Sequence, residues 1–138
     1  MQLPGEQPIS SEFLNRMRDL IRHRGPDDAG SYISPDGRVG LANRRLAIID
    51  RSAAGRQPLS NEDGKIWIAY NGETYNFADL RTELQECGHK FRSQTDTEVV
   101  VHLYEQYGME CVQHMRGMFA LAIWDENRKF LFLARDRL

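Results

Sequence analysis

The sequence has little cysteine and no recognisable metal-ligand spacing. Its 138 residues include only two cysteines, Cys87 and Cys111, and these form no CxxC pair. Two cysteines are too few for a disulfide framework, so we expect two reduced, partly buried thiols. The four histidines form no pattern such as HxxxH. Spacing alone therefore predicts no metal site.

Long apolar runs and an excess of basic charge are also missing. The longest apolar stretch, GMFALAIW at residues 117–124, is far shorter than the roughly 20 residues that span a bilayer. The first ten residues, MQLPGEQPIS, have neither the basic nor the apolar region of a secretory signal. The formal net charge is -2, which gives no basic footprint for nucleic acid or an anionic membrane. We expect a cytoplasmic protein with small-molecule or protein partners.

Common catalytic motifs are absent. There is no GxSxG, no P-loop, no GxGxxG after a strand and no HExxH. Any chemistry must therefore come from residues that the fold brings together. At 41% hydrophobic residues, the chain is long enough for one compact domain with its own core, or for a piece of one.

The N-terminal half predicts a helix followed by strands. Ser10 or Ser11 can cap a helix with an apolar face, and Gly25-Pro26 ends it. A turn at residues 34–37 should join residues 32–33 and 39–43 in a β-hairpin. LAIID (residues 46–50) reads as a strand covered on both faces, and KIWIAYN (residues 65–71) as the next strand.

The C-terminal half predicts two helices and a hairpin. Asn76 can cap a helix over residues 77–87, with Leu80, Leu84 and Cys87 facing inward. Asp96 or Thr97 can cap a third helix that ends at Gly108, and a short helical stretch should follow at residues 111–115. MFALAIW and FLFLARD, joined by DENRK, predict an antiparallel hairpin with both strands buried. This order favours an α+β fold with antiparallel sheets and segregated helices.

A set of polar residues falls at predicted strand and helix ends: Arg44, Arg45, Asn71, Gly72, Glu73 and Asp96. Asn-Gly after a strand is a strong signal for a tight turn, so we expect the chain to reverse there. An arginine fork suits a carboxylate, paired carboxylates suit an ammonium, and an amide with a glycine N–H suits an oxyanion. Together these groups fit an amino acid with a reactive amide. Spacing alone nevertheless favours turns, caps and solvated charges.

Seven motifs in order carry a family resemblance. They are HRGPDD (23–28), RRLAIID (44–50), QPLSNEDG (57–64), YNGETYN (70–76), TDTEV (95–99), GMFALAIWD (117–125) and LARDRL (133–138). On these motifs the chain, from about residue 23 to 138, resembles the glutaminase domain of glutamine-hydrolysing asparagine synthetases. That domain is a class II glutamine amidotransferase with the N-terminal-nucleophile fold, a sandwich of two antiparallel sheets with flanking helices. Glu73 after Asn71-Gly72 favours the asparagine-synthetase branch, because sister families usually carry His-Asn-Gly.

The resemblance implies a role for each polar residue. Arg45 would hold the α-carboxylate of glutamine, and Glu73 and Asp96 would hold its α-ammonium. The Asn71 side-chain amide and the Gly72 backbone N–H would form the oxyanion hole.

Three further residues are implied to have supporting places. Arg44 would support the site or face solvent. His23 and Asp28 would order the RGPD loop rather than take part in chemistry.

The resemblance also implies parts that this sequence does not show. The family nucleophile is a cysteine exposed by removal of the initiator Met, whereas Met1 is followed here by Gln2. The family's first strand, the strands beyond LARDRL and the ATP-using synthetase domain are missing as well. We therefore expect one partial glutaminase domain over residues 1–138, incomplete at both ends. A truncated chain and a misassigned start codon are favoured over a natural pseudoenzyme.

The functional hypothesis follows from this resemblance. The parent protein would hydrolyse glutamine through a cysteinyl thioester and deliver ammonia to ATP-activated aspartate, with the final acceptor left open. ATP and Mg²⁺ are implied for the synthetase domain and no cofactor for this chain, which alone should be inactive. The expected partners are glutamine and that synthetase domain, and exposed sheet edges leave a homodimer open. Two alternatives remain, a non-catalytic glutamine-binding or interaction module and a globular domain with merely solvated loops.

Overall fold

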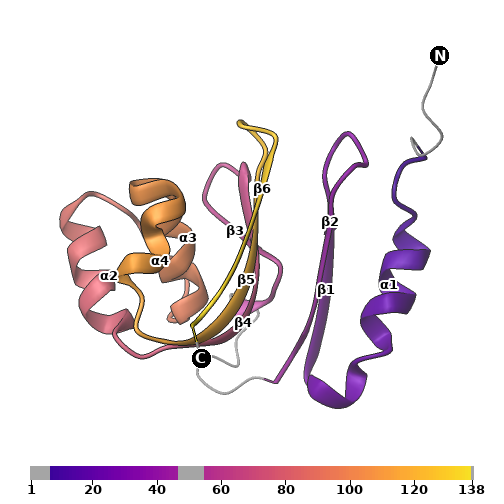
Figure 1. Ribbon diagram of the computed structural model, residues 1–138, viewed down its shortest axis with the longest axis horizontal. Helices are drawn as coiled ribbons and strands as arrows, with labels where there is room; N and C mark the ends of the chain where they lie inside the picture. Colours follow the sequence, from indigo (N-terminus) through magenta and orange to yellow (C-terminus); the bar gives the residue numbers. More distant parts are fainter. Residues whose placement is uncertain (1–6, 47–54, 138) are drawn as a thin grey trace.

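The computed structural model describes residues 7–46 and 55–137 and shows four layers (Figure 1). A two-stranded sheet and a four-stranded sheet lie face to face, with α1 outside the first and the remaining α-helices outside the second. The elements are α1 (Ser11–Asp19), η1 (Arg22–Arg24), β1 (Asp28–Ile33), β2 (Gly40–Arg45), β3 (Leu59–Ser60), β4 (Ile66–Thr74), α2 (Phe77–Glu86), α3 (Asp96–Tyr107), η3 (Gly108–Glu110), α4 (Cys111–His114), β5 (Gly117–Asp125) and β6 (Phe130–Arg135). No helix in the described ranges is both long and apolar enough to cross a bilayer.

Both sheets are antiparallel. Strands β1 and β2 form the predicted hairpin, with Asp28 opposite Arg45, and the larger sheet has the order β3-β4-β5-β6. The predicted C-terminal hairpin is β5–β6. The predicted α+β architecture of two antiparallel sheets with flanking helices is therefore confirmed. Most of the LAIID strand prediction falls on residues 47–50, which lie outside the described residues.

Two contacts between the sheets fix which faces meet. The rings of Tyr32 on β1 and Trp67 on β4 stack with centroids 4.1 Å apart. The side-chain amide of Asn43 on β2 donates to the carbonyl oxygen of Tyr70 on β4 at 3.3 Å. The faces that carry Tyr32 and Trp67 are therefore the inner faces of the sandwich.

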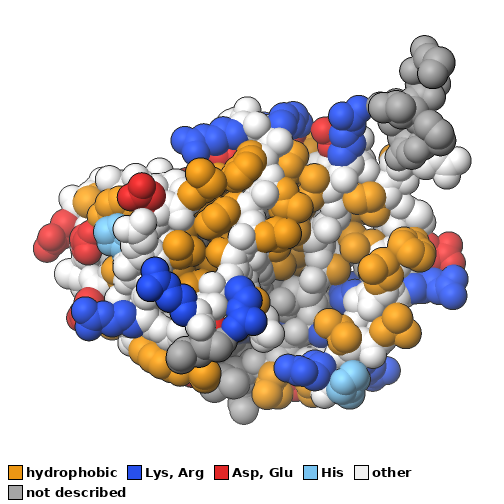
Figure 2. All heavy atoms as spheres, in the orientation of Figure 1, with side chains coloured by type: hydrophobic (Ala, Val, Ile, Leu, Met, Phe, Trp, Pro, Cys, Tyr) orange, Lys and Arg blue, Asp and Glu red, His pale blue; other side chains and the backbone are white. Residues whose placement is uncertain are grey.

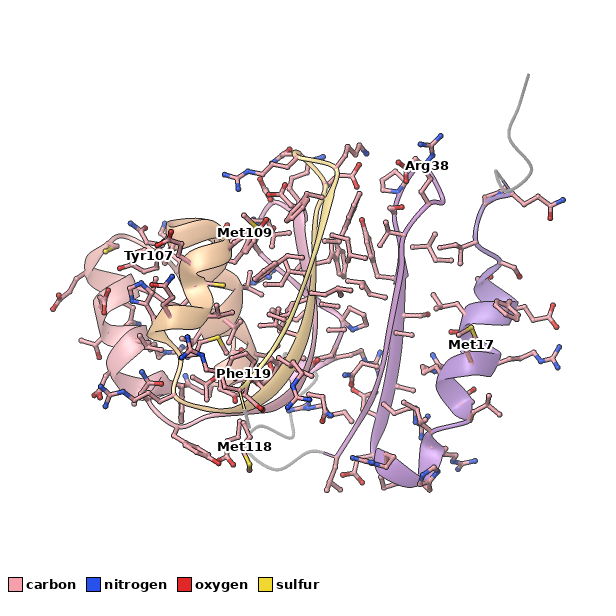
Figure 3. All side chains as sticks on the ribbon, in the orientation of Figure 1. Met17, Arg38, Tyr107, Met109, Met118 and Phe119 are labelled. Atoms are coloured by element: carbon pink, nitrogen blue, oxygen red, sulfur yellow. The ribbon has the colours of Figure 1, made fainter. Side chains whose placement is uncertain are left out.

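The apolar core lies between the four-stranded sheet and the helices. Ile68 on β4, Leu84 on α2 and Leu103 on α3 have no exposed surface. Neighbouring residues on a strand point to opposite faces. Phe119 on β5 is accordingly buried in this core, whereas Met118 beside it is 56% exposed (Figure 3).

The predicted chain reversal at Asn71-Gly72 is wrong. Strand β4 continues through both residues to Thr74, and Gly72 lies opposite Phe119 of β5. Asn-Gly indicates a local preference for a turn. The backbone here is instead fixed by pairing with β5, whose partner for Gly72 lies 47 residues further along the chain.

Helix caps were predicted with mixed success. Ser10 caps α1 as predicted, since its hydroxyl accepts from the Phe13 N–H. The cap of α3 is Thr95, which accepts from the Glu98 N–H, and Asp96 and Thr97 lie inside the helix. The alternatives Asp96 and Thr97 are therefore wrong by one or two residues.

Asn76 occupies the N-cap position of α2 without capping it. Its side chain instead donates to the carbonyl of His114 and accepts from the Arg116 N–H. These bonds join the start of α2 to the segment that leads into β5. The residue was placed correctly, but its hydrogen bonds are tertiary rather than local.

Two burial predictions are wrong, and one apolar face is exposed. Cys87 is exposed at the end of α2. Strand β6 is largely uncovered, with Leu133 66% exposed. The apolar residues of α1 and the residues after it are also exposed: Phe13, Met17, Leu20 and Ile21. Figure 2 shows hydrophobic side chains on the viewed side of the molecule, over β6 and over α1.

Candidate functional site

Side-chain alternation brings residues of β2 and β4 together between the sheets. Arg45 lies two positions from Asn43 on β2 and therefore shares its inner face. Asn71 and Glu73 lie four and six positions from Trp67 on β4, so they too point toward the first sheet. An arginine, an amide and a carboxylate from two sheets thus approach one another at one end of the sandwich.

A pocket of about 310 Å³ opens at this end. That volume lies at the lower end of the range typical of small-molecule sites. Its lining includes all five residues that were predicted as site residues: Arg45, Asn71, Gly72, Glu73 and Asp96. Residues as far apart in the sequence as Arg45 and Asp96, 51 positions, therefore line a single concave surface.

Asp96 enters the pocket from the first turn of α3. The backbone N–H of Thr74 donates to its carboxylate at 3.0 Å, and the residue is only 6% exposed. Burial raises the pKa of Asp96 above its usual value, and the negative charge of Glu73 adds to this effect, although backbone N–H groups oppose it. Two carboxylates that repel each other in this way form a site that a cation would stabilise.

Arg45 is packed rather than extended into solvent. A Cβ atom added to buried Gly55 would lie 2.7 Å from one guanidinium nitrogen of Arg45 and 2.9 Å from the Thr95 methyl group. The guanidinium group therefore lies against the backbone of Gly55, beside the residue that caps α3. Such packing limits the rotamers of Arg45 and positions its fork at the pocket.

Gly72 is required by the close approach of β5. Its φ is +153°, and a Cβ there would lie 2.2 Å from the Met118 carbonyl oxygen and 2.6 Å from the Phe119 Cα. No side chain fits in this space. The backbone at position 72 is consequently bare where it lines the pocket.

Sequence reasoning missed Gln57 as a site residue. This residue is 7% exposed and lines the pocket. Its side-chain oxygen accepts from the Tyr70 N–H at 2.7 Å, and its side-chain nitrogen donates to the Thr97 hydroxyl at 3.1 Å. Gln57 thereby joins β4 to α3 beside Asp96. The only signal for it was its place in the QPLSNEDG motif.

Six other lining residues were also missed: Arg24, Asn43, Leu46, Tyr70, Thr95 and Thr97. All of them except Asn43 fall within the motifs that carry the family resemblance, as Gln57 does. Within those motifs, neither residue type nor spacing separated them from residues with structural roles.

The three residues expected to have supporting places lie around the site. Arg44 donates from Nε to the Gly25 carbonyl at 2.8 Å, and its side chain is 9% exposed, so it is held within the fold rather than facing solvent. Asp28 accepts from Arg56 and from the Ala29 N–H. His23 is exposed in η1.

Neither cysteine of the chain lines the pocket. Cys87 follows α2 on the helical side of the larger sheet, and Cys111 is fully buried in α4. Burial raises the pKa of the Cys111 thiol to about 11. A protonated, enclosed thiol is a poor nucleophile, so the pocket holds binding groups without a cysteine beside them.

The fold itself resembles that of known amidotransferases. Glutamine phosphoribosylpyrophosphate amidotransferase from B. subtilis superposes with a TM-score of 0.59 and 25% sequence identity, over 70% of this chain and 23% of that one. A structure described as the allosteric regulatory enzyme of purine biosynthesis gives a TM-score of 0.60, also at 25% identity. The two facing antiparallel sheets with outer helices are thus the fold of the N-terminal-nucleophile amidotransferases.

Sequence comparison narrows this class to a family. A family model described as the glutamine amidotransferase domain matches residues 4–138. The chain therefore belongs to the glutamine amidotransferase domain family.

Three curated relatives show the range of proteins that contain such a domain. Asparagine synthetase [glutamine-hydrolyzing] 2 of Bacillus subtilis is 46% identical over 134 residues, and asparagine synthetase [glutamine-hydrolyzing] 1 of Arabidopsis thaliana is 45% identical over 118 residues. Amidase chry2 of Gibberella zeae is 43% identical over 135 residues. These alignments cover 97%, 86% and 98% of this chain. The chain spans only 17%, 19% and 20% of the respective relatives.

Proposed function

We propose that this domain binds L-glutamine in the pocket between β2, β4 and the start of α3, as the ammonia-releasing part of a glutamine amidotransferase. The observation that carries the proposal is the convergence of Arg45, Glu73, Asp96, Asn71 and Gly72 on one pocket. The family resemblance implies the same five residues, whose charges and hydrogen-bonding groups together suit an amino acid that carries an amide.

The α-carboxylate and the α-ammonium of glutamine would be bound by side chains of opposite charge. The Arg45 fork takes the α-carboxylate, since a guanidinium group matches a carboxylate with two parallel hydrogen bonds. Glu73 and Asp96 take the α-ammonium, whose positive charge relieves the repulsion between them. This arrangement selects an α-amino acid over a simple amide.

The side-chain amide would then meet Asn71 and Gly72. Attack of a thiolate on the amide carbon places negative charge on the former carbonyl oxygen, and donors aimed at that oxygen lower the barrier. When the tetrahedral intermediate collapses, the proton given up by the thiol passes to the leaving nitrogen, so that a thioester forms and ammonia departs. Water then hydrolyses the thioester to glutamate and restores the thiol. The Asn71 side-chain N–H and the Gly72 backbone N–H are the proposed donors.

The thiol for this step does not come from Cys87 or Cys111, because neither lines the pocket. We therefore expect the 138-residue chain to bind glutamine without turning it over. Turnover that persists in a Cys87→Ala, Cys111→Ala double variant would contradict the proposed thiol chemistry. A chain that binds glutamine and lacks turnover also fits a glutamine-binding module, the second candidate function.

The use of the ammonia is a further part of the proposal. Relatives named asparagine synthetases support aspartate as the acceptor, activated by ATP and Mg²⁺ in a synthetase domain that would be the partner of this one. The relative named amidase chry2 keeps other acceptors open. A cytoplasmic location is proposed on the same grounds, and a homodimer stays open.

Isothermal titration of the purified chain tests glutamine binding directly. L-Glutamine should bind at one equivalent, whereas D-glutamine, which misdirects either the carboxylate or the ammonium, should bind at least tenfold more weakly. The proposal fails if both enantiomers give equal affinity or if neither binds at millimolar concentration.

A further inference from the structure

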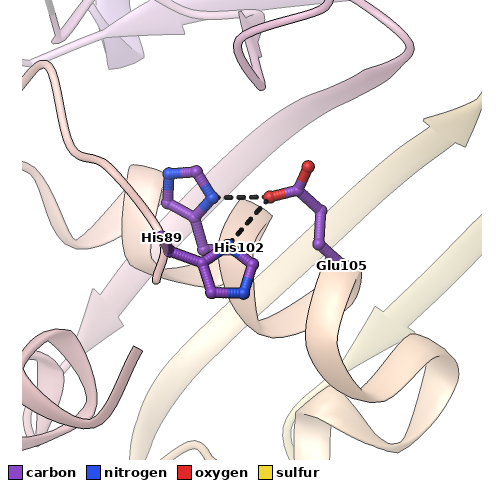
Figure 4. A group of neighbouring side chains, drawn as sticks. All are labelled: His89, His102 and Glu105. Atoms are coloured by element: carbon purple, nitrogen blue, oxygen red, sulfur yellow. Dashed lines mark hydrogen bonds and ion pairs between the residues drawn. The ribbon is translucent and has the colours of Figure 1, made fainter. Parts of the chain in front are cut away.

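A second cluster of functional groups lies outside the glutamine pocket. His89 is in the connection between α2 and α3, and His102 and Glu105 are three residues apart on α3, which places them on one helix face. One potential ligand atom from each residue lies within 4.8 Å of the other two (Figure 4). None of the three residues lines the pocket.

One separation between these atoms matches that of a tetrahedral metal site, and another is now a hydrogen bond between His102 and Glu105. Zinc–nitrogen bonds of 2.0–2.1 Å in a tetrahedron place neighbouring ligand atoms about 3.3 Å apart. One Glu105 carboxylate oxygen lies 3.5 Å from His89 Nδ1, near this value, and 2.5 Å from His102 Nδ1. The Glu105 oxygen and His102 Nδ1 would have to move apart by roughly 0.8 Å to admit an ion between them. This is within the reach of a glutamate side chain.

The non-ligating atoms of His89 and Glu105 are already held. His89 Nε2 lies 3.1 Å from the side-chain oxygen of Gln106, and the second carboxylate oxygen of Glu105 accepts from the Asn61 side chain at 2.7 Å. Metal-bound imidazoles usually donate their other N–H to such an acceptor, which fixes the ring and the tautomer. The cluster thus has an outer ring of orienting groups as well as candidate ligands.

His102 is the buried member of the cluster, and its Nδ1 is the atom hydrogen-bonded to Glu105. The residue is 1% exposed, with the Phe91 ring edge-on at 4.7 Å, and its Nε2 has no hydrogen-bond partner in the described part of the chain. A Glu62 carboxylate oxygen lies 3.9 Å from that Nε2. If Nδ1 coordinates an ion, the proton moves to Nε2, where it faces the Glu62 carboxylate.

We propose that His89, His102 and Glu105 bind one zinc ion, with a fourth position for water. Two imidazoles and one carboxylate suit zinc better than magnesium, which prefers an octahedron of oxygen ligands. The ion would join the α2–α3 connection, which leads to Thr95 and Asp96, to the second and third turns of α3. Sequence spacing could not reveal the site, because 13 positions separate the two histidines and only the fold makes them neighbours.

Zinc competition against a chromophoric chelator tests the proposal. The full chain is used as a tag-free Cys87→Ser variant, because exposed Cys87 lies two residues from His89 and could bind zinc by itself. We expect one equivalent of Zn²⁺, no competition from Mg²⁺ and, with Co²⁺, the visible absorption of a four-coordinate ion. No binding at stoichiometric zinc, or an octahedral Co²⁺ spectrum, would overturn the site.

Single variants assign the ligands. His89→Gln and Glu105→Gln should each weaken zinc binding at least tenfold, whereas His114→Gln, a histidine on the same side of the sheet and outside the cluster, should leave it unchanged. Gln106→Ala replaces an exposed side chain on α3 and should cost about ten- to a hundredfold without unfolding the chain. Equal zinc affinity in the Gln106→Ala and His89→Gln variants and their parent would show that the metal binds elsewhere.

Discussion

The backbone N–H of Thr74 donates to the Asp96 carboxylate at 3.0 Å and fastens the end of β4 to the first residue of α3. Because Glu73 immediately precedes Thr74, this bond also sets the position of Glu73 relative to Asp96. The second carboxylate of the pocket is thus placed by a contact between two segments 22 residues apart.

The charge of Asp96 should cost stability while the pocket is empty. Burial raises the folded-state pKa of Asp96 above 3.8, so the folded chain holds the proton more tightly than the unfolded chain does. The loss of folding stability is therefore complete at a pH above the raised pKa of Asp96. It fades as the pH falls through that pKa toward 3.8. In Asp96→Asn, the amide oxygen can still accept from Thr74. This variant should resist urea better than the wild type at pH 7, and the difference should shrink toward pH 4.

Asp79→Asn is the matched control for that experiment. Asp79 also lies in the first turn of a helix, α2, but it is exposed. Its replacement should leave stability unchanged or slightly lower, because only a favourable interaction with the helix dipole is lost. An Asp96→Asn variant that is less stable than the wild type at pH 7, with a difference independent of pH, would contradict the buried-charge explanation.

Glu73 and Asp96 should recognise the α-ammonium of glutamine and no other part of it. Glu73→Gln and Asp96→Asn should each weaken glutamine binding by about 1.5–3 kcal/mol, roughly ten- to a hundredfold, as expected for a hydrogen bond to a charged group. The analogue that lacks the α-amino group should bind these variants as well as it binds the wild type. Titration calorimetry with both ligands completes a double-mutant cycle. Equal losses for the two ligands would assign the carboxylates a structural role instead.

Arg45 should recognise the α-carboxylate. Arg45→Ala should weaken glutamine binding by about ten- to a hundredfold, and Arg45→Lys should recover only part of it, because an ammonium lacks the planar fork. The glutamine analogue that lacks the α-carboxyl group should bind Arg45→Ala and the wild type with equal affinity. Arg128→Ala serves as the control, since that side chain is 66% exposed and lies outside the pocket. Unchanged glutamine affinity in Arg45→Ala would remove this residue from the site.

Gly72 should tolerate no side chain. In Gly72→Ala, the new methyl group would meet the Met118 carbonyl at 2.2 Å, in addition to the strain of a positive φ. Positive φ alone costs roughly 1–3 kcal/mol, and the clash adds to it. Gly64→Ala measures the cost of a positive φ without a clash, because Gly64 also has positive φ but has no atom within 4 Å of its Cβ position. Urea denaturation should show a larger loss for Gly72→Ala, and equal losses would rule out the clash.

Much of the fold was readable from local patterns. The hairpins β1–β2 and β5–β6 and the helices α2 and α3 follow from apolar periodicity and turn residues that act over a few positions. The errors occurred where a distant partner overrides a local preference. Asn71-Gly72 has the composition of a turn, yet pairing with β5 keeps it extended. The periodicity of α1 and the apolar run of β6 cannot say whether anything covers these faces, and both are exposed.

The sequence by itself determined which groups are available: an arginine, two carboxylates, an amide and a bare glycine, in motifs that resemble one family. Their residue types limit the ligand, because charge and hydrogen-bonding capacity belong to the side chain. Only the tertiary structure decided which of these groups meet. Strand alternation turns Arg45 toward Asn71 and Glu73, and Gln57 and Thr74 fix α3 against β4, while the same fold brings His89 to His102. Such proximities depend on packing between distant segments, which no local pattern encodes.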